Sequence, residues 1–237
     1  MARNLNVAVW LLCGTMTIAT IFDRPTFAYT IDPIETQTAI QIDSVNAGKQ
    51  YQQGVTAAAA GNFTQAMSSF DRAITLNPQY FAAYIERGNV KDGMGDLTGA
   101  IADYTTAISI DSKSAIAYYN RATVLSKSGK HPAAIADYDT AVSLDPNYAQ
   151  AYMNRGNELD DAGNSQGAIA SYERAIQIRP KYALAYLNRG IAYARAGNRN
   201  RAIADFQFAA KLFTEVGAID RANHALNLIK DLQSEVY

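Results

Sequence analysis

The stretch AYMNRGNELDDAGNSQGAIASYERAIQIRP, residues 151–180, decides the fold of this chain, because close copies of it recur at a fixed distance. Its Arg155 has counterparts at Arg87, Arg121 and Arg189, each 34 residues from the next, and a Tyr stands three residues before each one. Five consecutive 34-residue blocks can be laid over one another: 47–80, 81–114, 115–148, 149–182 and 183–216. Self-similarity at such a period predicts a repeat protein.

Each block is predicted to form two helices joined by a turn. A Tyr near the start of the block is followed four residues later by a small residue on the same helix face, as in Tyr152 and Gly156. A second Gly, such as Gly163, stands where a residue with positive φ would end the first helix. The second helix carries an aromatic residue such as Tyr172 between two alanines at helical spacing. Proline closes three of the five blocks and stops the second helix there.

Helices of about a dozen residues are marginal alone in water, so such pairs must stack on one another to bury their apolar faces. The Tyr, the small residue, the Ala-flanked aromatic and the terminal Pro resemble the tetratricopeptide repeat, here of an Asn-Arg-Gly type. This resemblance implies an all-α fold, a right-handed superhelical solenoid of antiparallel helix pairs. The chain departs from the pattern at Gln50, where the Tyr is missing, and at Ser112 and Thr214, where Pro is usual. The first block therefore resembles a worn terminal repeat.

The last segment, residues 217–237, is predicted to be an amphipathic capping helix that covers the open end of the fifth block. Its apolar face is expected to hold Ile219, Ala222, Leu226, Ile229 and Val236. The alternative for this segment is a partner-binding helix.

The N-terminus carries the pattern of a signal peptide over residues 1–28. Arg3 supplies a positive charge, the segment from Val7 to Phe22 is an apolar run, and small residues before position 29 suit cleavage after Ala28. The run is shorter than the roughly 20 residues of a membrane-spanning helix, and an uncleaved signal anchor is the alternative. Residues 29–46 are predicted to form a polar linker. We therefore expect export from the cytoplasm to a periplasm or an equivalent lumen, with membrane association through residues 7–22 if the segment is kept.

Composition argues against several classes of function. A net charge of −1 with scattered Lys and Arg gives no basic face for nucleic acid. One Cys and two distant His make a metal site improbable, and no cofactor motif is present. A His-based catalytic triad is implausible, so an enzyme is the least expected class.

The recurring Arg is expected to have a structural partner in the second helix of its block. An Asp follows 16 residues after three of the four arginines, which predicts ion pairs within a block or between neighbouring blocks. The pairs are Arg87 with Asp103, Arg121 with Asp137 and Arg189 with Asp205.

Asparagines beside these arginines are candidates for ligand contact. In the family that the chain resembles, first helices line a concave groove, and similar Asn runs in protein O-glycosyltransferases bind a peptide backbone. An amide matches a peptide bond because it both donates and accepts. The resemblance places Asn120, Asn154 and Asn188 in a polar ladder, helped by Asn89 and Asn157. The alternative is that each Asn bonds only a neighbouring repeat.

Apolar residues are expected on the same inner face, where exposure would indicate a partner. They are Ile85, Ile116, Tyr119, Met153, Leu187 and Ile191. The family's cationic carboxylate clamp is not expected, because Ile85, Gln150 and Asn154 stand where its cations belong. The sequence thus favours a non-catalytic scaffold that binds a peptide segment of a protein partner, with assembly of an envelope or membrane complex as its use. The alternative is a homo-oligomeric structural protein.

Overall fold

The computed structural model describes residues 8–12, 15–19, 29–30 and 33–234. The chain divides into two compact units, residues 1–83 and 84–237, which are treated separately below. From Pro33 onward the described elements are helices. The prediction of an all-α repeat fold is therefore confirmed for this part of the chain.

The first unit begins with short strands. Strands β1 (Ala8–Leu12) and β2 (Thr15–Ala19) pair antiparallel, and β3 (Tyr29–Thr30) pairs antiparallel with β2. Strands β1 and β2 fall within the apolar run of the predicted targeting segment, and β3 falls at the start of the predicted linker. The expected cleavage site after Ala28 lies outside the described residues. Among the helices described, none has both the length and the apolar character required to cross a membrane.

Helix α1 (Pro33–Ala59) differs from the expected linker, because residues 33–46 form its first half. The sequence showed no helical period there because residues 41–45 are all exposed, so no buried face imposes a pattern. Pro33 is well suited to the first helical position, and the helix runs without interruption into the first block.

The first block is less worn than its missing Tyr suggested. Helix α2 (Phe63–Leu76) packs against α1, and the Tyr51 ring lies 6.0 Å from Phe70 and 5.1 Å from Tyr80 between centroids. Tyr119, which has the same place in its own block, makes matching contacts at 6.0 and 4.8 Å. Tyr51, one residue after Gln50, therefore gives the first block the same contacts between aromatic rings.

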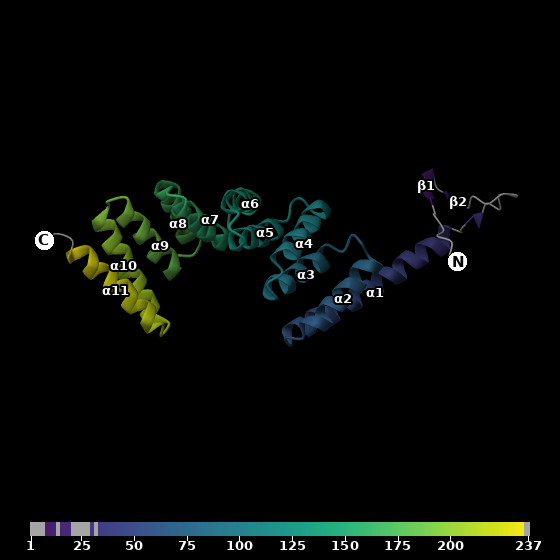
Figure 1. The fold of residues 1–237 in the computed structure, drawn as a ribbon, viewed down its shortest axis with the longest axis horizontal. Coiled ribbons are helices and arrows are strands. Elements are labelled where there is room, and N and C mark those ends of the chain that lie inside the picture. Colours follow the sequence, from purple (N-terminus) through teal and green to yellow (C-terminus); the bar gives the residue numbers. More distant parts are fainter. Residues whose placement is uncertain (1–7, 13–14, 20–28, 31–32, 235–237) are drawn as a thin grey trace. The chain divides into compact units, whose positions relative to one another are not determined.

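The remaining helices alternate along the chain: α3 (Phe81–Gly93), α4 (Leu97–Ile110), α5 (Ala115–Lys127), α6 (His131–Leu144), α7 (Ala149–Asp161), α8 (Ser165–Ile178), α9 (Ala183–Arg195), α10 (Arg199–Glu215) and α11 (Ile219–Ser234). In the second unit, α4 to α11 each pack against the next in chain order (Figure 1). The first helix of each pair ends at a Gly with positive φ, as predicted. At α7 the N–H of Asn164 donates to the Leu159 carbonyl across Gly163, which satisfies a free carbonyl at the helix end.

The core consists of the alanines and aromatics that the repeat pattern singled out. In α8, Ala168 and Ala175 are fully buried and Tyr172 nearly so. A Cβ at Gly156 of α7 would lie 2.5 Å from Cε1 of Tyr172, closer than real side chains approach. The small residue in the first helix therefore makes room for the ring of the second.

Helix α11 packs on α10, but its buried face is rotated from the expected one. Ala222, Ala225 and Ile229 are buried, whereas Ile219 and Leu226 are 52% and 44% exposed. Small residues at the contact let the helices approach closely, so the alanines face inward rather than the larger Leu226. Val236 lies outside the described residues.

Candidate functional site

The recurring arginines form bidentate ion pairs within their own helix pairs. Nε and Nη2 of Arg121 donate to the two carboxylate oxygens of Asp137 at 2.7 and 2.8 Å. The same geometry joins Arg87 to Asp103 and Arg189 to Asp205, at distances from 2.6 to 2.9 Å. Hydrogen bonding to Asp137 raises the pKa of Arg121 above its ordinary value, against the opposing effect of burial. Because all three carboxylates are buried between helices, these residues hold each pair together.

Arg155 departs from that arrangement because Ser171 replaces the Asp of its own pair. Its Nη1 donates to Ser171 Oγ at 2.7 Å, and its Nε donates to Asp139 Oδ1 at 2.5 Å. Asp139 belongs to α6 in the preceding block, so this guanidinium links two blocks.

The apolar residues expected in the groove do not form one exposed strip. Ile85, Met153 and Leu187 are only 5–7% exposed, and the latter two lie in a core cluster with Tyr172 and Phe206. The prediction that these three residues line an open groove is therefore wrong, because their side chains pack between the helices. Ile116 is 48% exposed, and Tyr119 and Ile191 are partly exposed.

Side-chain amides join the second and third blocks. The Oδ1 of Asn89 accepts hydrogen bonds from Tyr104 Oη at 2.8 Å and from Asn120 Nδ2 at 3.2 Å. Its Nδ2 donates to Glu86 Oε2 at 3.1 Å, so both ends of this amide are engaged. The asparagine ladder therefore has a structural component.

The same arrangement recurs between the fourth and fifth blocks, with one difference. The Oδ1 of Asn157 accepts from Tyr172 Oη at 2.9 Å and from Asn188 Nδ2 at 2.8 Å. Within the described residues, Nδ2 of Asn157 and Oδ1 of Asn188 make no hydrogen bond. This joint thus presents one oriented donor and one oriented acceptor that are not used by the fold.

The joint between the third and fourth blocks lacks this amide pair. Thr123 replaces the asparagine and lies 3.1 Å from Tyr138 Oη, and Asn154 Nδ2 donates to Tyr119 Oη at 3.3 Å. Of the three joints, the one between the fourth and fifth blocks has the most free amide groups among the described residues.

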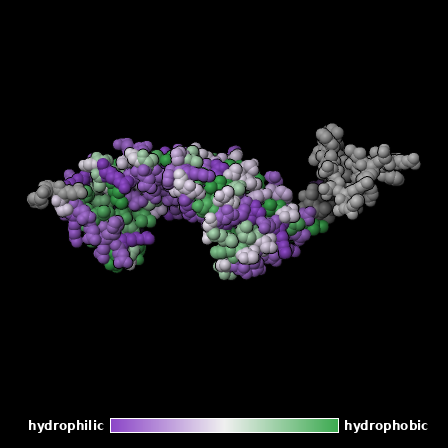
Figure 2. Space-filling model, viewed as in Figure 1, coloured by the Kyte–Doolittle hydropathy of each residue, from purple (hydrophilic) through white to green (hydrophobic). Residues whose placement is uncertain are grey.

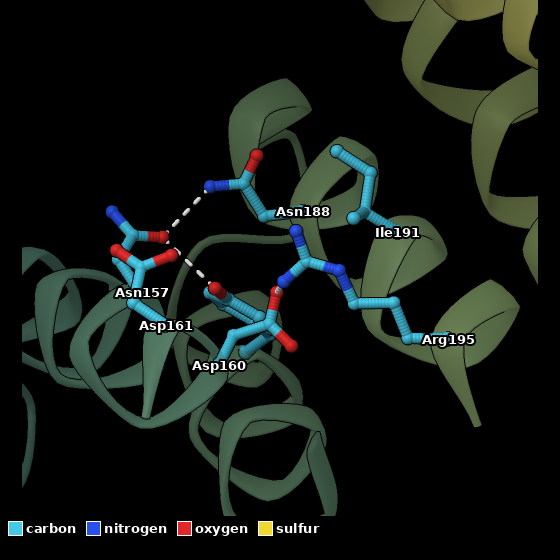
Figure 3. Close-up of a pocket in the computed structure, with 7 residues that line it drawn as sticks. Asn157, Asp160, Asp161, Asn188, Ile191 and Arg195 are labelled. Atoms are coloured by element: carbon cyan, nitrogen blue, oxygen red, sulfur yellow. Dashed lines mark hydrogen bonds and ion pairs between the residues drawn. The ribbon is translucent and has the colours of Figure 1, made fainter. Parts of the chain in front are cut away.

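A pocket of about 270 Å³ opens at that joint (Figure 3). Its lining is Asn157, Asp160, Asp161, Tyr172, Asn188, Ile191 and Arg195. Arg195 Nη1 pairs with Asp160 Oδ2 across the pocket, and the Asp160 side chain is only 8% exposed. Burial is the main cause that raises the pKa of Tyr172 above its ordinary value, with the charges of Asp160 and Asp161 next.

A cluster around Glu158 was missed by sequence reasoning. The buried Glu158 carboxylate accepts a hydrogen bond from Ser126 Oγ at 2.5 Å, and His131 Nδ1 lies 2.9 Å from its second oxygen. The positions that correspond to Glu158 in neighbouring blocks hold Val or Ala. A charged residue at a position that is otherwise apolar was therefore the feature of the sequence that could have revealed the cluster. Across the described residues, no group of three or more His, Cys, Asp or Glu is arranged to hold a metal ion.

Comparison with known proteins agrees with this geometry. Residues 50–80 and 115–148 match models described as tetratricopeptide repeat, and residues 94–129 and 156–197 match a model described as TPR repeat. No curated protein sequence matches the chain.

Similar solved structures share the fold over most of the chain. A crystal structure of MamA protein is 25% identical, with a TM-score of 0.67, over 73% of this chain and 94% of that one. A second MamA structure is 27% identical, with a TM-score of 0.66, over 70% and 96% of the two chains. YrrB, described as a TPR protein with an unusual peptide-binding site, is 22% identical with a TM-score of 0.66, over 81% and 97%. On its helix pairs, its close Gly–aromatic contacts and these matches, the chain belongs to the tetratricopeptide-repeat proteins.

Proposed function

We propose that this protein is a non-catalytic interaction scaffold, with all five blocks acting as repeat units, that binds an extended peptide segment of a partner. The observation that carries the proposal is the amide pair at the joint between the fourth and fifth blocks. Asn157 Oδ1 is saturated by two donors, which fixes the orientation of both amides. The free Nδ2 of Asn157 and the free Oδ1 of Asn188 complement the carbonyl and the N–H of a peptide bond. YrrB, described as having a peptide-binding site, supports this use of the fold.

The test uses the full chain as bait for partners from native extract, beside the variant Asn157→Thr. Thr123 occupies the corresponding position of the third block and lies 3.1 Å from Tyr138 Oη, so this neutral substitution keeps a partner for the Tyr172 hydroxyl and removes the free amide donor. The matched control is Asn89→Thr, which removes the amide where its donor is already used on Glu86. We expect a partner peptide, located by cross-linking to α7 and α9, that Asn157→Thr loses and Asn89→Thr retains. Equal retention by both variants, with both folded, would show that the amide pair is structural.

A homo-oligomer is the second candidate, and the exposed apolar side chains of α11 favour it. Ile219 and Leu226 are both at least 44% exposed. Apolar residues are visible among polar ones over the end of the second unit that holds α10 and α11 (Figure 2). A concentration-dependent oligomer in sedimentation that Leu226→Gln abolishes would favour this function, whereas a monomer at all concentrations would rule it out.

Export and use in assembling an envelope or membrane complex belong to the same proposal. They rest on the charge, apolar run and small residues of segment 1–28. Intact mass of the protein from its native source tests the point. A chain that begins at Tyr29 supports cleavage, retention of the segment in a membrane fraction supports an anchor, and an intact chain in the cytoplasm refutes export.

A further inference from the structure

We propose that the pocket where Asn157 and Asp161 of α7 face Asn188 and Arg195 of α9 receives a basic side chain from the bound segment. The inference rests on the peptide binding proposed above and adds the chemical class of the residue that is held. A pocket of about 270 Å³ falls just below the roughly 300–1,000 Å³ typical of whole small-molecule sites, which suits a single side chain.

Charge pairing along the first helices leaves one carboxylate without a cation at this place. Asp92 of α3 pairs with Lys127 of α5 at 2.7 Å, and Asp160 of α7 pairs with Arg195 of α9. In each pair the cation follows the acid by 35 residues. The joint between the third and fourth blocks has no such pair. There Asp161 occupies the position of the cation, and Ser126, 35 residues earlier, occupies the position of the acid.

The Ser126 hydroxyl does not donate a hydrogen bond to Asp161, because it donates to Glu158 instead. Asp161 makes no ion pair within the described residues, whereas Asp160 beside it is neutralised by Arg195. The pocket therefore has one carboxylate in excess, and a positive charge on the ligand would complement it. A carboxylate ligand would instead meet the excess negative charge of Asp161.

The unused hydrogen-bonding groups agree with that charge. Asp161 and the Oδ1 of Asn188 are acceptors, which suit the N–H groups of a guanidinium or ammonium. Among the side-chain amides of the pocket, the free donor is Asn157 Nδ2, which is left for a main-chain carbonyl of the same segment. The chain itself places a guanidinium in this pocket, where Arg195 meets Asp160 (Figure 3).

The experiment titrates the full chain with three blocked amino acids and follows the side-chain amide NMR signals of Asn157 and Asn188. The probes are N-acetyl-arginine methylamide, its neutral isostere with citrulline, and N-acetyl-glutamate methylamide. All three carry the same peptide groups; arginine and citrulline have nearly the same shape and differ in charge, whereas glutamate reverses the charge on a shorter side chain. The variant is Asp161→Asn, and Asp231→Asn on α11 is the matched control for loss of one exposed carboxylate.

We expect arginine to bind about two- to fivefold more tightly than citrulline, as fits an exposed ion pair, and glutamate to bind most weakly. Asp161→Asn should remove the preference, whereas Asp231→Asn should keep it. If all three probes shift the signals alike, or if Asp161→Asn keeps the preference, the basic class is refuted while peptide binding stands. If no probe shifts either signal, both proposals fail.

Discussion

Replacing Gly156 with alanine tests whether the repeat depends on the close approach of α7 and α8. The new methyl carbon would lie 2.5 Å from Cε1, 2.8 Å from Cδ1 and 2.9 Å from Cζ of Tyr172. The ring cannot move freely, because it is 1% exposed and its hydroxyl donates to Asn157 Oδ1 at 2.9 Å. Relief of the clash therefore requires a shift of the helices together with the loss of that hydrogen bond.

The change in unfolding free energy is the sum of two losses and one gain. Overpacking a core costs about 1–3 kcal/mol. Loss of the Tyr172 hydrogen bond costs about 0.5–1.5 kcal/mol. Alanine regains about 1 kcal/mol over glycine in a helix interior. The expected net loss of unfolding free energy is about 0.5–3.5 kcal/mol.

Urea unfolding followed by far-UV circular dichroism measures this change, and Gly48→Ala provides the control. A Cβ at Gly48 of α1 meets no atom within 4 Å, so the same substitution should stabilise by about 0.5–1 kcal/mol. Opposite signs for the two variants are the expected result. If Gly156→Ala is as stable as the unmodified protein or more so, close approach at this position does not limit the packing.

Three further changes probe other parts of the fold. Lys130 precedes α6 without a side-chain cap, so Lys130→Asp should raise the unfolding free energy by about 1 kcal/mol, and an unchanged urea midpoint would contradict this. Ile229→Ala should lower the unfolding free energy by about 2–4 kcal/mol, because Ile229 is buried against α10. Leu226→Ala should cost far less, because Leu226 is exposed. Equal shifts of the melting temperature for the two variants would argue against the observed buried face of α11. Burial raises the pKa of Tyr138 and of Tyr148 from 10.0 to about 12, so the folded state holds these protons more tightly than the unfolded chain. Stability should therefore fall as pH rises from 10 towards 12, and ultraviolet titration of the folded protein should show phenols that ionise late; full ionisation near pH 10 without unfolding would refute the burial.

Much of the fold could be predicted because its determinants are local and repeat every 34 residues. The turn at Gly163 needs positive φ, and the ring of Tyr172 needs a small neighbour at Gly156, so both signals lie within one block. The sequence does not predict a helix over residues 33–46 because it has no apolar period there, and the exposed residues 41–45 bury no face that would impose one.

The candidate site could be predicted only in part. The asparagines were found because they recur beside the arginines, but which amide atoms remain free depends on neighbours in the same helix as well as on contacts between blocks. Asn89 uses its Nδ2 on Glu86, whereas Asn157 has no such neighbour and keeps its donor. Repetition alone could not separate these two cases.

By itself the sequence determined the repeat, the turns and the Gly–aromatic packing, since excluded volume and backbone geometry act within each 34-residue block. Tertiary structure decided which side chains are buried, as for Met153, and which charge lacks a partner, as for Asp161. The physical reason is that the amide bonds and ion pairs which join the first helices of neighbouring blocks connect residues 31–35 positions apart, and their geometry is set only when neighbouring helices stack.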